Sequence, residues 1–194
     1  MRTIVVATNN FGKVKEFKEL FQEDCLLTLK DIQYDKEIEE KGNTFYDNAL
    51  SKARQVSKDT GYIVLADDSG LEVAALGGEP GVHSARYAKD HDDQANNALL
   101  LKKLNGKTQR DARFVCALCL YFPNDFYFMA EGYCTGVITT EARGTNGFGY
   151  DPYFLVPEFN QTMAQMPLSV KNKISHRAKA LQTLKEKLNE NSCN

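Results

Sequence analysis

The sequence has little net charge, few cysteines and no long apolar run, and each scarcity excludes a class of protein. The formal net charge is −2 at pH 7, so no global field favours nucleic acid or an anionic membrane. We therefore expect neither as a partner, and any polyanion site must be local. No apolar stretch approaches the roughly 20 residues that span a bilayer. The N-terminal "MRTIVVATNN" lacks the longer apolar region of a signal peptide.

The cysteines give no disulfide framework, because the five are an odd number and are scattered along the chain. Cys116 and Cys119 form a C-x-x-C within the apolar run "RFVCALCLYF". Strand geometry would turn them to opposite faces, which does not suit joint metal ligation. We predict that they are reduced core residues, and we expect a reducing, cytoplasmic location.

Apolar segments with strand character alternate with amphipathic segments, which predicts an α/β protein. With 194 residues, the chain is long enough for one domain over 1–194 with a substantial core. A first strand–helix–strand unit is expected to join longer, antiparallel strands around one mixed sheet. Strands are predicted over 3–8, 26–29, 62–66, 112–122, 126–139 and 153–156, and helices over 13–21, 44–58, 94–104 and from 175 onward.

The stretch "TNNFGK", residues 8–13, lies between the first predicted strand and the first predicted helix. A helix N-terminus offers unpaired N–H groups and a positive dipole end, which suit a phosphate group. Gly12 would let the backbone approach an anion, and Lys13 adds a positive charge. The spacing is not that of a P-loop, and an ordinary strand-to-helix turn is the alternative.

The stretch "ADDSG", residues 66–70, follows a predicted buried strand, the place where ligands bind in α/β sheets. Mg²⁺ is usually held by one or two carboxylates together with substrate phosphates, so Asp67, Asp68 and Ser69 could form such a site. Glu40, just before the next predicted helix, could share the cation with Asp68. The alternatives are a polar turn closed by Gly70 and a solvated acidic stretch.

Two later stretches could complete a ligand site. In "GTNGFGYDP", residues 144–152, Phe148 or Tyr150 could stack on a nucleobase. In "KNKISHRAKAL", residues 171–181, Lys171, His176 and Arg177 surround a helix start that Ser175 would cap. Cations there oppose the helix dipole, so an anionic or carbonyl-bearing ligand would compensate them. A plain connecting loop and an exposed surface are the alternatives.

Taken together and in this order, these stretches resemble the Ham1/RdgB-type inosine triphosphate pyrophosphatase family. The resemblance implies an α/β fold with an elongated mixed β-sheet, flanked by helices in two lobes with a substrate cleft between them. It also implies a homodimer, and Mg²⁺-dependent hydrolysis of ITP, dITP, XTP or dXTP to the monophosphate and pyrophosphate. The matching stretches are "ATNNFGKVKEF", "GNTFYDNALSKA", "ADDSGLEV", "PGVHSARYA", "RFVCAL", "GFGYDPYF" and "KNKISHRAKAL".

The resemblance further implies individual roles. Asp68 would accept a proton from the attacking water and would bind Mg²⁺ together with Glu40. Arg177 would donate to the carbonyl at C6 of the base. His83 departs from the family pattern, which often has Tyr there, and the segment before Lys171 lacks the usual acidic residues. Substrate contacts are expected from Thr8, Asn9, Asn10, Phe11, Gly12, Lys13, Ser69, Phe148, Gly149, Tyr150, Asp151, Lys171, His176 and Arg177.

Two other functions fit parts of the sequence. One is a Maf-like pyrophosphatase acting on standard or modified pyrimidine triphosphates, which a substrate panel would distinguish. The other is a non-catalytic module that binds nucleotide or RNA. The clustered acidic residues argue against RNA, because they would repel its phosphate backbone.

Overall fold

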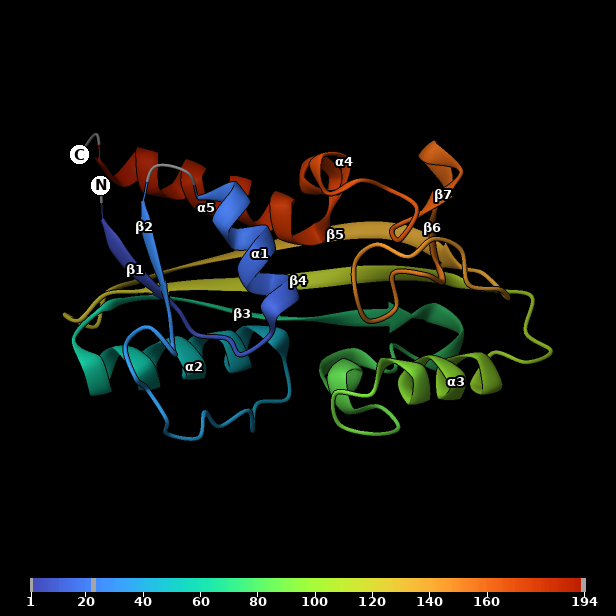
Figure 1. Ribbon diagram of the computed structural model, residues 1–194, viewed down its shortest axis with the longest axis horizontal. Helices are drawn as coiled ribbons and strands as arrows, with labels where there is room; N and C mark the ends of the chain where they lie inside the picture. The colour runs from blue at the N-terminus through green and yellow to red at the C-terminus, as the bar shows by residue number, and fades with distance from the viewer. Residues whose placement is uncertain (1, 22–23, 193–194) are drawn as a thin grey trace. The chain divides into compact units, whose positions relative to one another are not determined.

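The computed structural model describes residues 2–21 and 24–192 and contains one seven-stranded sheet in the order β2-β1-β3-β4-β5-β6-β7 (Figure 1). The sheet is mixed and is flanked by helices, which confirms the predicted α/β fold. The strands are β1 (Thr3–Val6), β2 (Cys25–Thr28), β3 (Ile63–Val73), β4 (Asp111–Tyr121), β5 (Tyr127–Ile138), β6 (Phe154–Val156) and β7 (Gln161–Thr162). The α-helices are α1 (Phe11–Leu20), α2 (Phe45–Thr60), α3 (Asp93–Lys103), α4 (Leu168–Ile174) and α5 (His176–Ser192).

The N-terminal strands are parallel and the later ones antiparallel. Strand β1 pairs in parallel with both β2 and β3, so the predicted strand–helix–strand unit is confirmed. Strands β4 and β5 are neighbours joined by only five residues, 122–126. That connection is too short for a parallel crossover, which needs a dozen or more residues. Strand β6 pairs antiparallel with β5 and with β7.

The chain forms two compact units that are interleaved in sequence. The first contains residues 1–68, 116–132 and 177–194, and the second contains 69–115 and 133–176. Strands β3, β4 and β5 contribute residues to both units. The two halves of β3 therefore belong to different units, and the division falls between Asp68 and Ser69.

The core of the first unit is built from strands with helices on both faces. Ile4 and Val6 alternate with Val5, and only the first two join the cluster that includes Phe17 of α1 and Leu181 of α5. Helix α2 lies on the other face of β1 (Figure 1), where its buried residues recur at helical spacing. The alternation of strand side chains thus separates the helices between the two faces.

The second unit has its own apolar cluster. It brings Leu100 and Leu104 of α3 against Leu71 of β3, Phe114 of β4 and Phe154 of β6. Each unit therefore carries an apolar core of its own.

The cysteine prediction is confirmed where the structure describes it. Cys116 and Cys119 are buried thiols, and only Cys116 belongs to the cluster with α1 and α5. Burial raises the pKa of Cys119 to about 12, so this thiol stays protonated. Cys25 is exposed, and Cys193 lies outside the described residues. Across residues 2–21 and 24–192, the helices are all too short or too polar to cross a bilayer.

Two local expectations were wrong. The strand predicted over 62–66 does not end there, because β3 continues to Val73, and the polar turn considered as the alternative does not form. Helix α4 was not predicted, although it carries Lys171. The start of α2 at Phe45 agrees with the helix predicted over 44–58, and the Thr44 hydroxyl caps it by accepting a 3.0 Å hydrogen bond from the Asp47 N–H.

Candidate active site

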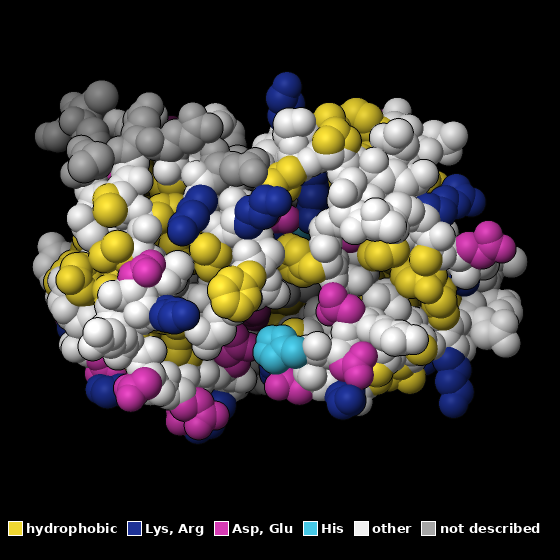
Figure 2. Space-filling view, in the orientation of Figure 1, with side chains coloured by type: hydrophobic (Ala, Val, Ile, Leu, Met, Phe, Trp, Pro, Cys, Tyr) yellow, Lys and Arg dark blue, Asp and Glu magenta, His cyan; other side chains and the backbone are white. Residues whose placement is uncertain are grey.

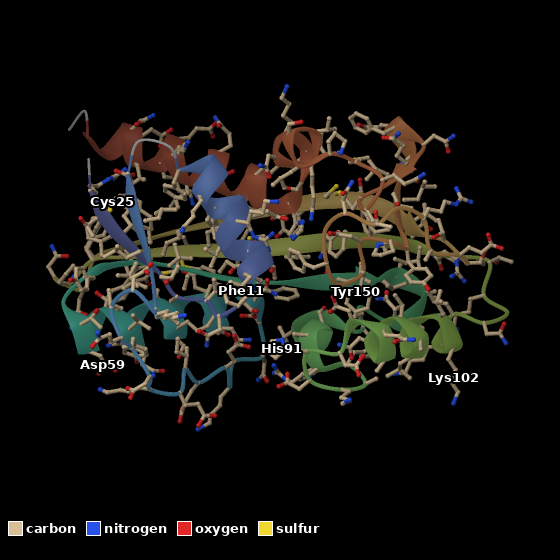
Figure 3. All side chains as sticks on the ribbon, in the orientation of Figure 1. Phe11, Cys25, Asp59, His91, Lys102 and Tyr150 are labelled. Carbon is tan, nitrogen blue, oxygen red and sulfur yellow. The ribbon has the colours of Figure 1, made fainter. Side chains whose placement is uncertain are left out.

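The loop after β1 is fixed by its own side chains and leads directly into α1. The Thr8 hydroxyl accepts a 3.2 Å hydrogen bond from the Asn10 N–H. The Asn10 side chain caps the helix by accepting from the Lys13 N–H at 3.2 Å. Phe11, the first helical residue, is 87% exposed and lies at the start of α1 (Figure 3). Asn9 is exposed and Gly12 is partly exposed, so this helix N-terminus is formed as predicted.

Asp67 and Asp68 lie beyond the end of β1 and point to opposite sides of β3. The pairing of β1 with β3 ends at Val6 and Leu65, so β3 runs past its neighbour before it reaches the two acids. Adjacent strand residues face opposite sides. Asp67 contacts groups on α1 and α5, whereas Asp68 contacts groups on α2.

On the first side, Asp67 is held by two cations. Its Oδ2 lies 3.0 Å from the Lys13 Nζ and 3.3 Å from the Arg177 Nη2, and Arg177 also pairs with Glu16. Burial would raise the pKa of Asp67, but Lys13 and Arg177 outweigh it, so the pKa lies well below its ordinary value of 3.8. Asp67 is therefore ionised at neutral pH, which does not suit it to accept a proton.

Arg177 is part of this buried charge network. Its side chain is 1% exposed, between the carboxylates of Glu16 and Asp67. Burial disfavours the charged guanidinium, but these two carboxylates more than compensate and raise the pKa of Arg177. The predicted contact with a base carbonyl would need Arg177 to donate from within this network.

On the other side, Asp68 and Glu40 share one ammonium group. The Asn48 Nδ2 donates to the Asp68 Oδ2 at 2.9 Å. The Lys52 Nζ lies 2.6 Å from the Glu40 Oε1 and 3.9 Å from the Asp68 Oδ1. Burial, the largest effect, and nearby Glu40 raise the pKa of Asp68 above its ordinary value in spite of Lys52. Asp68 is therefore the better proton acceptor of the two aspartates.

The Lys52 ammonium provides a test of whether a metal cation fits here. Burial lowers its pKa, but the carboxylates of Asp68 and Glu40 outweigh burial and raise it. One positive charge thus contacts both acids, as a shared metal ion would. Within the described part of the chain, no three His, Cys, Asp or Glu residues are grouped to hold a metal. Two carboxylates completed by substrate phosphates are the usual ligands of Mg²⁺, so the residues fit that ion.

In the second unit, the predicted base-side loop is held by Asp151. Its Oδ2 accepts from the Phe148 N–H at 3.0 Å and pairs with the Lys171 Nζ at 2.7 Å. The Lys171 ammonium also lies 5.0 Å from the Phe148 ring centroid. Gly147 has φ +79°, and a Cβ there would lie 2.0 Å from the Asp151 Oδ2. Glycine at 147 therefore permits this close approach.

The two aromatic residues of the loop differ in accessibility. Tyr150 is 5% exposed, and its hydroxyl donates to the Ser84 carbonyl at 2.8 Å. It packs in the core, so of the two only Phe148 is left partly exposed for stacking. Gly149 is fixed by α3, where Asp93 accepts from its N–H at 2.7 Å and Asn97 donates to its carbonyl at 2.9 Å.

The remaining predicted residues of this unit have defined places. His176 stacks on Phe114 with a ring-centroid separation of 4.9 Å. Ser69 lies in β3 and is partly exposed. His83, the departure from the family pattern, is exposed. In this way Phe148, Asp151 and Lys171 come together, whereas His176 is engaged by a core ring.

Sequence reasoning assigned no role to Asn48 or Glu16 and did not include Lys52 among the site residues. A signal was present for α2, because its buried stripe contains Asn48 and Lys52 among Phe45, Ala49, Ala53 and Val56. Polar residues at core positions of an amphipathic helix call for a partner. Glu16 shows no comparable signal, since its partner Arg177 is 161 positions away.

The fold and this arrangement are typical of α/β proteins that bind a phosphorylated ligand beyond the ends of parallel strands. The chain belongs to the Ham1 family, whose profile matches residues 4–187. It is 52% identical over 195 residues to the dITP/XTP pyrophosphatase of Bacillus licheniformis, with 98% of this chain and 100% of that protein covered. It is 48% identical over 193 residues to the Bacillus subtilis dITP/XTP pyrophosphatase, covering 97% and 98% of the two chains.

Solved structures agree with this membership. The Ham1 protein of Staphylococcus aureus matches with a TM-score of 0.88 and 42% identity, covering 98% of this chain and 100% of that one. The HAM1 protein of Coxiella burnetii also matches with a TM-score of 0.88, at 40% identity and the same coverage. The family resemblance recognised in the sequence is thereby confirmed.

Proposed function

We propose that this protein hydrolyses non-standard purine nucleoside triphosphates, dITP/ITP and XTP/dXTP, to the monophosphate and pyrophosphate. The observation that carries the proposal is the pair of carboxylates, Glu40 and Asp68, on one ammonium group. The adjacent Asp67 pairs with Lys13 of α1. The full-length similarity to dITP/XTP pyrophosphatases supports the same reaction and disfavours the Maf-like alternative.

The proposed reaction uses Asp68 as the proton acceptor. A water molecule attacks the α-phosphorus, the bond between the α-phosphorus and the bridging oxygen to the β-phosphorus breaks, and pyrophosphate leaves. The raised pKa of Asp68 suits acceptance of the water proton. The N–H groups at the start of α1 and the Lys13 ammonium would hold the phosphates and offset their charge.

Glu40 and Asp68 are the residues that would hold Mg²⁺. When bound, the ion would neutralise phosphate oxygens and polarise the reacting phosphorus. Lys52, which contacts both carboxylates, would then be displaced toward the phosphates. Asp67 keeps Lys13 in place without competing for the proton, because its own pKa is low.

The proposed base selection assigns stacking to Phe148 and recognition of the base carbonyl to Arg177. Phe148 would stack on the base, with Lys171 and Asp151 setting its position. Hypoxanthine and xanthine carry a carbonyl at C6, where adenine carries an amino group. A protein donor that faces the amino group of adenine is left unpaired, which can lower kcat/KM for the adenine nucleotide by about 10⁴-fold. Exclusion of guanine would depend on its desolvated 2-amino group.

The test is a panel of nucleoside triphosphates, assayed for pyrophosphate release with Mg²⁺ and with EDTA. We expect turnover of ITP, dITP and XTP with Mg²⁺, little turnover of ATP, and loss of activity in EDTA. Preference for pyrimidine triphosphates would favour the Maf-like alternative, and binding without turnover would favour a non-catalytic module. Arg177→Ala should reduce the preference for ITP over ATP, and unchanged selectivity would remove Arg177 from base recognition.

The partner and location assignments belong to the same proposal. We expect a homodimer, which sedimentation of the purified protein would test. We also expect a cytoplasmic location, which fits the free, buried thiols of Cys116, Cys119 and Cys134. We expect neither nucleic acid nor membrane as a partner. On the face drawn in Figure 2, basic and acidic side chains are interspersed, an arrangement unlike the basic stripe of nucleic-acid-binding proteins.

A further inference from the structure

The side chain of Asn48 joins the two carboxylate-bearing segments of the first unit. It is 0% exposed, and both ends of its amide are used. The Nδ2 donates to the Asp68 Oδ2 at 2.9 Å, and the Oδ1 accepts from the Gly42 N–H at 2.8 Å. Gly42 lies two residues after Glu40 in the same loop. A single amide on α2 therefore ties β3 to the loop that carries Glu40.

We propose that Asn48 is a positioning residue, which sets the geometry in which Glu40 and Asp68 receive a divalent cation. This inference rests on the proposed function, because it assigns the cation to these two carboxylates. Asn48 engages the Oδ2 of Asp68, while the Oδ1 faces the Lys52 ammonium at 3.9 Å. The amide thus orients the carboxylate so that its other oxygen faces the same positive charge that Glu40 contacts.

The polarity of the two partners fixes the orientation of the amide. The carboxylate of Asp68 only accepts when ionised, and the Gly42 N–H only donates. A reversed amide would face oxygen to oxygen and N–H to N–H. Neither arrangement makes a hydrogen bond, so the reversed amide would leave buried polar groups unpaired, which is unfavourable. Asn48 can therefore link the two segments in one orientation only.

Gly42 gives independent support for this link. A Cβ at position 42 would lie 2.7 Å from the Asn48 Oδ1 and 2.8 Å from the Asp47 Cβ. The loop backbone reaches the amide only because residue 42 has no side chain. The contact between the loop and α2 therefore requires both an amide at position 48 and a glycine at position 42.

Helix α2 provides a rigid base for the amide. Thr44 caps the helix, and Ala49 and Ala53 are completely buried. Lys52 follows Asn48 by four residues, so both lie on the same face of the helix. Helix α2 thus presents an amide that holds Asp68 and the loop, and an ammonium that contacts Glu40 at 2.6 Å.

The experiment compares variants that break the link with a buried control on the same helix. Asn48→Leu keeps a similar volume but removes both hydrogen bonds, whereas Gly42→Ala keeps the amide and places a Cβ against it. Ser57→Ala is the control, because Ser57 is also buried on α2 but bonds to the Tyr62 carbonyl at 2.7 Å. Binding of Mn²⁺ alone, measured by electron paramagnetic resonance, gives a readout independent of turnover.

We expect Asn48→Leu and Gly42→Ala to weaken Mn²⁺ binding by about 10- to 100-fold, and to raise the Mg²⁺ concentration for half-maximal activity similarly. Ser57→Ala should change neither, even if its melting temperature falls. Cation binding that is unchanged in Gly42→Ala and in folded Asn48→Leu would overturn the inference. If Asn48→Leu does not fold, Gly42→Ala decides alone.

A further variant separates this inference from the proposed function. Glu40→Gln should abolish Mn²⁺ binding if the cation site is assigned correctly. If Glu40→Gln binds Mn²⁺ as wild type does, the proposed cation site itself is wrong. If Glu40→Gln loses binding while the Asn48 and Gly42 variants keep it, only the role of Asn48 is wrong.

Discussion

Asp67 and Asp68 are neighbours in β3, yet their carboxylates enter different environments. Asp67 is paired with Lys13 and Arg177. Asp68 accepts a hydrogen bond from Asn48 and lies 3.9 Å from the Lys52 ammonium. The pKa of Asp67 is consequently lowered and that of Asp68 raised. Strand alternation thus brings two adjacent acids to different partners, so that Asp67 is ionised at neutral pH and Asp68 accepts a proton more readily.

Replacing Asp68 by asparagine should remove activity and stabilise the fold. Loss of the proton acceptor should reduce pyrophosphate release from ITP by about 10²- to 10⁴-fold. The raised pKa means that ionised Asp68 opposes folding as pH rises from 3.8 through its folded-state pKa. Metal-free Asp68→Asn should therefore melt above wild type at pH 7, with the difference shrinking toward pH 4.

The control for this prediction is Asp111→Asn, which changes an exposed carboxylate at the start of β4. It should leave both turnover and melting temperature near wild type. Near-normal turnover of Asp68→Asn would exclude Asp68 from the central role.

Replacing Asp67 by asparagine should instead destabilise the protein. Removing one partner from a buried ion pair typically costs about 3–5 kcal/mol, measurable by urea unfolding at pH 7. Because the folded-state pKa of Asp67 lies below 3.8, its stabilisation is complete above that pH and is lost as pH falls through the folded-state value. Wild type should therefore lose stability on acidification more steeply than Asp67→Asn. Parallel pH dependences would contradict the assignment of these charges.

Gly147 and Gly149 form a matched pair for testing the base-side loop. Both have positive φ, but a Cβ meets the Asp151 carboxylate only at Gly147. Alanine at either position should cost about 1–2 kcal/mol of backbone strain. Only Gly147→Ala should also displace Asp151 from Lys171 and raise KM for ITP. Equal KM values for ITP in the two variants would show that Asp151 does not position the substrate.

Lys52→Met should make the protein dependent on a divalent cation for stability. It leaves the buried Asp68 and the partly exposed Glu40 without their shared ammonium, and loss of that countercharge should destabilise the cation-free protein. Added Mg²⁺ should then raise the melting temperature of the variant more than that of wild type. Lys58→Met, which removes an exposed lysine from the same helix, is the control. A Mg²⁺-induced shift no larger than in wild type would argue against a cation at these carboxylates.

Much of the fold could be predicted from the sequence, because apolar periodicity reports which face of an element is buried. The segment 3–8 and the helix capped by Thr44 follow this rule, and both form as expected. The end of β3 was predicted too early, at residue 66, because the two acids and the glycine that follow resemble a turn locally. Their charges are compensated by α1, α2 and α5, so the strand continues through them.

The candidate site was predictable in its residue types but not in its pairings. The helix N-terminus at Asn10 and the acids Glu40 and Asp68 carry local signals. No local signal indicates the contacts of Tyr150 and Arg177, because each residue bonds to a partner far along the chain. Tyr150 bonds to Ser84 and Arg177 to Glu16, 66 and 161 positions away. Such partners are set by tertiary packing, which a local pattern does not contain.

The pairing of Glu16 with Arg177 has a consequence for biosynthesis. A ribosome releases α1 long before it reaches α5, so a nascent chain holds Glu16 and Asp67 without their shared guanidinium until the final helix emerges. Translation products that stop before α5 carry two buried-site acids with one countercharge missing. Such fragments are candidates for quality-control proteolysis and are not expected to accumulate as partly active enzyme.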